Sequence, residues 1–141
     1  MANEARVFAE GPDFCKVRQF TVADGTAIAK GALLVFTGAT RTAVVHTAAV
    51  KKAALGFAVQ SKTASDGVTE IGVQRTGVVD AYADGYISTG DIVLAGQTTA
   101  NRVQALADGY LSVYNFQSQV IGRALENAAN GTYCKIALAL G

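Results

Sequence analysis

The two halves of the chain repeat one pattern of glycines and apolar residues. Residues 26–73 read TAIAKGALLVFTG, then ALGFAVQ, then SDGVTEIGV, and residues 85–138 read GYISTGDIVLAGQ, then VIGRALE, then ANGTYCKIAL. The matched residues are Ile28 with Ile87, Gly31 with Gly90, Leu34 with Val93, Gly56 with Gly122, Ala58 with Ala124, Gly67 with Gly131 and, after a one-residue slip, Ile71 with Ile136. A duplicated β unit with glycine at fixed joints predicts a pseudo-symmetric barrel or sandwich.

Short runs rich in valine, threonine and isoleucine fill both halves, and turn dipeptides such as Asp24-Gly25 and Asp84-Gly85 separate them. We expect strands over residues 14–21, 32–37, 40–46, 55–61, 68–75, 77–81, 86–94, 102–106, 120–125 and 132–140. No apolar stripe with a 3.6-residue period extends beyond a turn or two. The sequence therefore predicts an all-β fold, a compact β-barrel or β-sandwich built from two similar units.

The predicted domain organisation is an extended N-terminal arm over residues 1–13 and a single β domain over residues 14–141, with the repeats at about 26–73 and 85–138. The arm carries a small apolar patch and ends in Gly11-Pro12, which breaks regular structure. Glycine inside a strand marks a bend or a close approach of two backbones. We expect bends at Gly31 and Gly90 and close backbone packing at Gly56 and Gly122.

Composition limits the functions open to such a domain. Only 16% of the 141 residues are charged, against about 25% in typical domains, which indicates a surface partly covered by a partner. The 12 basic and 11 acidic residues give a net charge of +1, which argues against an electrostatic nucleic-acid binder. No run approaches the roughly 18 apolar residues of a membrane span, and no secretory signal pattern opens the chain, so synthesis in a cytoplasm is expected.

Candidate catalytic and metal-binding residues are few. His46 is the only histidine, so it would have to serve as the base of any Ser-His or Cys-His system, and no nucleophile motif lies near it. Asp80 and Asp84 are close in sequence, but aspartates near glycine turns are more often solvated turn residues. Cys15 and Cys134 are expected to be buried thiols, and they pair only if the first and last strands are neighbours. We expect no enzyme activity, no metal and no cofactor.

The order of motifs resembles the small capsid cement, or head decoration, proteins of tailed bacteriophages. It runs from an Ile-x-x-Gly motif with a hydrophobic run, through VTEIGVQRTGVV and a second Ile-x-x-Gly-Asp, to the closing IGRALENAANGTYCKIALAL. The resemblance covers about residues 20–141 and excludes the segment 107–119 and the N-terminal arm. It implies a β-barrel-like domain on the outer surface of the capsid, bound to the major capsid protein as a homotrimer, with no catalysis, cofactor, nucleic acid, membrane or small-molecule substrate.

Partner contacts are expected where the repeat is interrupted, in residues 1–13 and 107–119. The predicted interface residues are Arg6, Val7, Phe8, Phe14, Tyr110, Tyr114 and Phe116. Arms of cement proteins often reach onto the capsid or onto a neighbouring subunit, a role that the resemblance implies for Arg6, Val7 and Phe8.

Two alternatives remain open from the sequence. One is a β-barrel that binds glycans or another ligand on a virion or cell-surface protein, with Tyr82, Tyr86 and Tyr110 lining a sugar platform. The other is a small barrel enzyme of an unfamiliar type, which would depend on His46.

Overall fold

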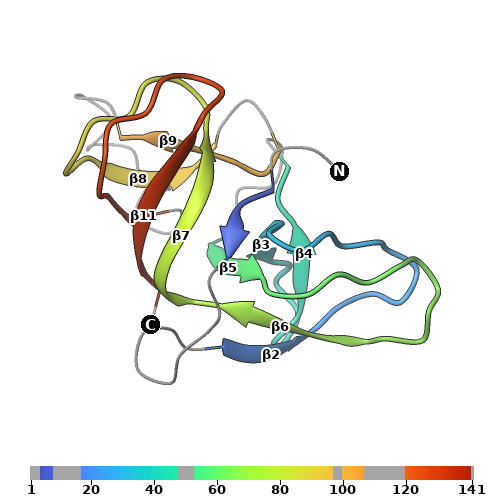
Figure 1. Ribbon diagram of the computed structural model, residues 1–141. Helices are drawn as coiled ribbons and strands as arrows, with labels where there is room; N and C mark the ends of the chain where they lie inside the picture. Colours follow the sequence, from blue (N-terminus) through green and yellow to red (C-terminus); the bar gives the residue numbers. More distant parts are fainter. Residues whose placement is uncertain (1–3, 8–16, 48–52, 97–99, 107–119, 141) are drawn as a thin grey trace.

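The computed structural model describes residues 4–7, 17–47, 53–96, 100–106 and 120–140. These residues form eleven β-strands and no helix (Figure 1). After the short β1 (Arg6–Val7), the first half supplies β2 (Val17–Thr21), β3 (Leu33–Phe36), β4 (Ala43–Val45), β5 (Ala54–Ala58) and β6 (Glu70–Gln74). The second half supplies β7 (Thr76–Ala83), β8 (Ile92–Ala95), β9 (Arg102–Ala105), β10 (Val120–Ala124) and β11 (Tyr133–Ala139).

The two halves pair their strands in the same order. The first unit forms a sheet in the order β2-β6-β5-β3-β4, and the second forms β7-β11-β10-β8-β9. In the second unit β9 also pairs in parallel with β7, which closes a five-stranded barrel. In the first unit an isolated parallel bridge between Thr21 and Thr42 lies at the same place. The all-β barrel prediction is confirmed, and the two units share one topology.

The pairing register shows which residues of the two units correspond. Thr21 lies opposite Glu70, as Tyr82 lies opposite Tyr133. Thr42 is the counterpart of Arg102, because Thr21 pairs in parallel with Thr42 and Tyr82 pairs in parallel with Arg102. The outward-facing positions of the two barrels can therefore be compared one by one.

One predicted match is wrong. Ile71 lies opposite Phe20, and the corresponding pair in the second unit is Cys134 with Ala81, so Ile71 corresponds to Cys134 rather than to Ile136. The reason is a loop length: the second unit is one residue shorter, not longer, between its glycine turn and its last strand. The slip between the two halves therefore runs in the direction opposite to the predicted one.

The predicted strand over residues 86–94 is also corrected. Ile87 makes only an isolated bridge to Ala128, and the strand β8 begins at Ile92. Gly90 has a φ of +87° and therefore ends extended structure in a left-handed turn, as does Gly31 with the same φ. These two glycines form turns before the strands instead of bends within them.

Close backbone packing at Gly56 and Gly122 is confirmed. A Cβ atom at Gly122 would overlap the carbonyl oxygen of Ala137 on the neighbouring β11. A Cβ at Gly56 would likewise overlap the carbonyl oxygen of Gln74, at the end of β6. Glycine at these two matched positions lets adjacent strands approach each other.

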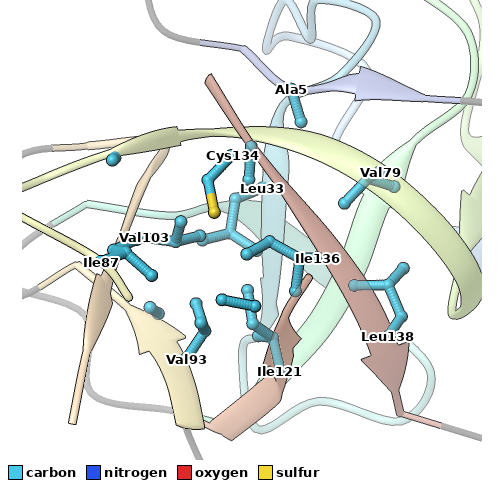
Figure 2. Close-up of a cluster of buried hydrophobic side chains, with 14 of the residues drawn as sticks. Ala5, Leu33, Val79, Ile87, Val93, Val103, Ile121, Cys134, Ile136 and Leu138 are labelled. Atoms are coloured by element: carbon cyan, nitrogen blue, oxygen red, sulfur yellow. The ribbon is translucent and has the colours of Figure 1, made fainter. Parts of the chain in front are cut away.

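The two units share part of their hydrophobic core. One cluster fills the second barrel with residues such as Val93, Ile121 and Ile136, and it also includes Leu33 and Phe57 from the first unit (Figure 2). A separate cluster fills the first unit. Because first-unit side chains complete the second core, the two barrels are expected to fold as one cooperative domain.

Polar groups also join the units at one buried point. The Asn101 side chain accepts a hydrogen bond from the Leu33 N–H at 3.1 Å, and the Asn101 N–H donates to His46 Nδ1 at 3.2 Å. His46 is 1% exposed and Asn101 is 2% exposed. The single histidine thus satisfies a buried backbone donor, a structural use of its ring.

Candidate interaction surface

Two of the seven predicted interface residues lie in the described part of the chain. Arg6 and Val7 form β1, whereas Phe8, Phe14, Tyr110, Tyr114 and Phe116 lie outside the described residues, as does Cys15. In the antiparallel pairing of β1 with β7, the backbone of Arg6 lies opposite Asp80 and that of Val7 lies opposite Val79.

Residues 4–7 of the N-terminal segment contact both units of the β domain. Ala5 is 6% exposed and belongs to the core of the second barrel. Its N–H donates to the carbonyl of Gly31 at 2.7 Å, and a Cβ at Gly31 would overlap the Ala5 carbonyl oxygen. The segment therefore contacts the first unit at Gly31 and pairs with the second unit along β7.

A row of aromatic and cationic side chains crosses the outer face of the second barrel. The Arg6 guanidinium lies 3.9 Å from the ring centroid of Tyr133. Tyr133 packs edge-on against Tyr82, with ring centroids 5.1 Å apart, and the Arg102 guanidinium lies 4.8 Å from the Tyr82 ring. These four residues, from β1, β11, β7 and β9, are called the tyrosine–arginine row. Each arginine faces a ring at a distance typical of a cation–π contact.

An ion pair lies beside the row on the same face. Lys135 Nζ is 3.0 Å from Asp80 Oδ1, and the side chain of Asp80 is 7% exposed while that of Lys135 is 50% exposed. The hydrogen bond to Asp80, followed by the charges of Asp80 and Glu126, raises the pKa of Lys135. Arg6 and Arg102 add two further cations to this face, and Glu126 adds a carboxylate that accepts the Lys135 N–H at 3.1 Å.

The corresponding positions of the first unit carry none of these groups. Tyr82, Tyr133 and Arg102 are replaced there by Thr21, Glu70 and Thr42, and the pair Asp80–Lys135 by Gln19–Gly72. Since both units have the same strand order, the fold itself does not require the tyrosines and arginines. Their presence on one barrel alone marks this face as the candidate interaction surface.

The row does not provide the flat open rings of a sugar platform. The faces of Tyr82 and Tyr133 are approached by Arg102 and Arg6, and both tyrosines are half-buried. Tyr86 is 63% exposed, whereas Tyr110 lies outside the described residues. A surface of arginines held by tyrosines is better suited to a protein contact, where both residue types are enriched.

Reactive groups in the described residues have structural surroundings. Burial, with the charge of Glu126, raises the pKa of the Cys134 thiol, which is buried and free. Within the described ranges, no group of three histidine, cysteine or acidic side chains is placed to hold a metal ion. The same residues contain no helix long and apolar enough to cross a membrane.

Sequence reasoning missed Tyr133 and Arg102, and it did not place Tyr82 among the predicted interface residues. The signal that could have found them is the difference between the repeats. Once the slip is placed correctly, Tyr82 and Tyr133 align with Thr21 and Glu70, which are small or charged. Aromatic side chains that replace such residues at outward-facing positions indicate a contact surface.

The Asp80–Lys135 pair gives a prediction about stability and pH. Lys135→Met removes the ammonium group and leaves a nearly buried carboxylate, so the urea midpoint falls at pH 8. Because the pKa of Lys135 is raised in the folded state, this stabilisation is complete below the unfolded pKa of about 10.4 and is lost as the pH rises through the folded value. The double variant Asp80→Asn/Lys135→Met recovers most of the midpoint. An equal loss in the single and double variants would contradict the pairing.

Comparison with known proteins gives one informative likeness. No family model and no curated protein matches the chain. Among solved structures, the chain is similar to the crystal structure of the head fiber gp8.5 N base in bacteriophage phi29, with a TM-score of 0.57 and 15% sequence identity. The alignment covers 91% of this chain and 97% of that chain. At this identity the likeness shows that the two chains share a fold over nearly their whole length.

Proposed function

We propose that this protein is a structural component of a tailed-phage head that binds the outer surface of the capsid. The observation that carries the proposal is the whole-length likeness to the base of a phage head fiber. It is supported by the sequence resemblance to capsid cement proteins, which rests on separate grounds. The finer proposal is a decoration protein that bridges subunits of the major capsid protein, binds as a trimer and acts without catalysis.

Such a protein would stabilise the shell through many modest contacts. A subunit that binds only the mature lattice stabilises each site by RT ln(1 + [L]/Kd), so occupancy determines the gain. Several contacts made together by a trimer add avidity to a weak individual contact. The tyrosine–arginine row supplies a suitable contact, because its arginines are held in place before binding and lose little side-chain freedom.

The test is co-sedimentation with heads that lack this protein, followed by heating or osmotic shock. We expect the wild-type chain to pellet with the heads and to raise their survival. Arg102→Ala is expected to weaken binding by about tenfold or more, as is typical of a central arginine at an interface. Thr42→Ala, at the corresponding position of the first unit, is the matched control and should bind normally.

The outcomes separate the general proposal from its details. Absence of co-sedimentation overturns the proposal of head binding. Co-sedimentation with unchanged survival contradicts the cement role and leaves a head protein of another kind, such as a fiber base. Equal binding by Arg102→Ala and Thr42→Ala removes the tyrosine–arginine row from the contact. Binding of glycans without binding to heads would favour the alternative of a glycan-binding module.

A further inference from the structure

The edge of β2 in the first unit corresponds to the edge of β7 that β1 covers in the second unit. Because Thr21 corresponds to Tyr82, Arg18 and Gln19 take the places of Val79 and Asp80. In the second unit those places pair with Val7 and Arg6 of β1. In the first unit, among the described residues, no strand pairs with this side of Val17–Gln19 (Figure 1).

The backbone of Gln19 is directed toward this open side. The Thr21 N–H donates to the carbonyl of Arg41, away from β6, and backbone groups two residues apart in a strand point the same way. The Gln19 carbonyl accepts a hydrogen bond of 2.9 Å from the Arg41 guanidinium. The exposed Arg41 side chain thus donates to a backbone carbonyl that would otherwise accept a hydrogen bond from a neighbouring strand.

Two arginines lie at this edge, and a third lies on the paired side of the strand. Arg41 and Arg75 lie 5.6 Å and 5.8 Å from the ring centroid of Phe20, and Arg18 is exposed on the strand itself. Burial and the charge of Arg18 lower the pKa of Arg75. Ion pairs within the described residues, such as Lys62–Asp66 and Lys135–Asp80, involve other side chains. The Arg75 guanidinium donates a 2.9 Å hydrogen bond to the Leu55 carbonyl of β5, beyond β6 from the open edge. The positive charge at the open edge therefore comes from Arg18 and Arg41.

We infer that the β2 edge binds an extended acidic segment of a partner protein as an added antiparallel strand. The segment would take over the Gln19 carbonyl, and the released Arg41 guanidinium would pair with one of its carboxylates. Main-chain hydrogen bonds supply affinity in this mode, and alternate side chains supply specificity. The inference rests on the proposed function only for the source of the segment, which would be the capsid shell.

The arrangement of β1 supports a strand as the occupant. The same position on the second barrel already accepts a strand of two residues, so the geometry of this fold accommodates a neighbour there. The charge differs between the two sites. On the β7 edge the residue opposite Arg6 is Asp80, whereas its counterpart on the β2 edge is the neutral Gln19, which is flanked by Arg18 and Arg41. We therefore expect an acidic partner at the β2 edge.

The test is an NMR titration of the full, isotope-labelled chain with a capped hexapeptide that alternates glutamate with threonine or valine. We expect shifts concentrated at Val17–Gln19 and slower amide exchange at Gln19. Methylation of the peptide amides, or Arg18→Gln/Arg41→Gln in the protein, should weaken binding by about tenfold or more. A lysine-for-glutamate peptide should not bind. Arg123→Gln, which removes another exposed arginine, should bind like the wild type.

The possible results decide between the inference and its competitors. Equal binding by the methylated peptide shows charge attraction alone and overturns the added strand. Protection of the Gln19 amide in the free protein shows that the edge is already covered and also overturns it. If the wild-type chain binds heads but does not bind the acidic peptide, this inference fails while the proposed function stands. If the peptide binds as expected and no chain binds heads, the proposed function fails and the edge remains a strand-binding site.

Discussion

Gly122→Ala is expected to destabilise the protein by about 3 kcal/mol or more, because the added methyl group meets backbone that cannot rotate away. The Cβ would overlap the carbonyl oxygen of Ala137, and it would lie 2.9 Å from that residue's carbonyl carbon and 3.1 Å from Leu138 Cα. Relief requires β10 and β11 to separate, which breaks the barrel at a central strand pair. Equilibrium unfolding in urea measures the loss.

Gly25→Ala and Gly90→Ala are the matched controls. A Cβ added at either glycine would have no atom within 4 Å, but Gly90 has a φ of +87°, whereas Gly25 has no such constraint. We expect almost no loss for Gly25→Ala and about 1–2 kcal/mol for Gly90→Ala, the usual cost of a left-handed alanine. If Gly122→Ala is no more costly than Gly90→Ala, close backbone packing is not the reason for glycine at Gly122.

The repeat in the sequence allowed much of the fold to be predicted. Equivalent places in the two units are occupied by glycine at Gly56 and Gly122 and by isoleucine at Ile28 and Ile87. Each place limits the size and shape of the side chain that fits, so the same residue type recurs in both halves of the sequence. Short strands between Asp-Gly turns were also readable, since turn chemistry is local. The limits of strand 86–94 were not, because a single glycine such as Gly90 does not show whether it bends a strand or turns the chain before one.

The candidate surfaces depend on contacts between distant segments, which a single sequence does not reveal. Arg6 meets Tyr133 only because β1 is adjacent to β7 and β7 is adjacent to β11. The open edge of β2 is visible only by comparison with the covered edge of β7. The predicted interface residues include Arg6 of the tyrosine–arginine row and none of the outward-facing positions at which the two units differ.

A buried lysine provides the second large effect. Lys62 Nζ donates hydrogen bonds to the carbonyls of Asp24 and Thr26, both at 2.9 Å, and of Thr63 at 3.1 Å, with the Ala23 carbonyl at 3.4 Å. Its side chain is 1% exposed and lies 3.5 Å from Asp66. The lysine thus joins the turn after β2 to the turn before β6.

Lys62→Met is expected to cost about 3–5 kcal/mol, because methionine fills the space but leaves several buried carbonyls without a donor. The counterpart of Lys62 in the second unit is Ala128, as the bridges Ile28–Lys62 and Ile87–Ala128 show, so the shared topology does not itself need the lysine. The requirement comes from the carbonyls that the first unit's longer turn directs inward. Lys30→Met, at an exposed lysine, is the control and should change the unfolding free energy by less than about 0.5 kcal/mol. Equal stability of the two variants in urea would mean that water can replace the ammonium group.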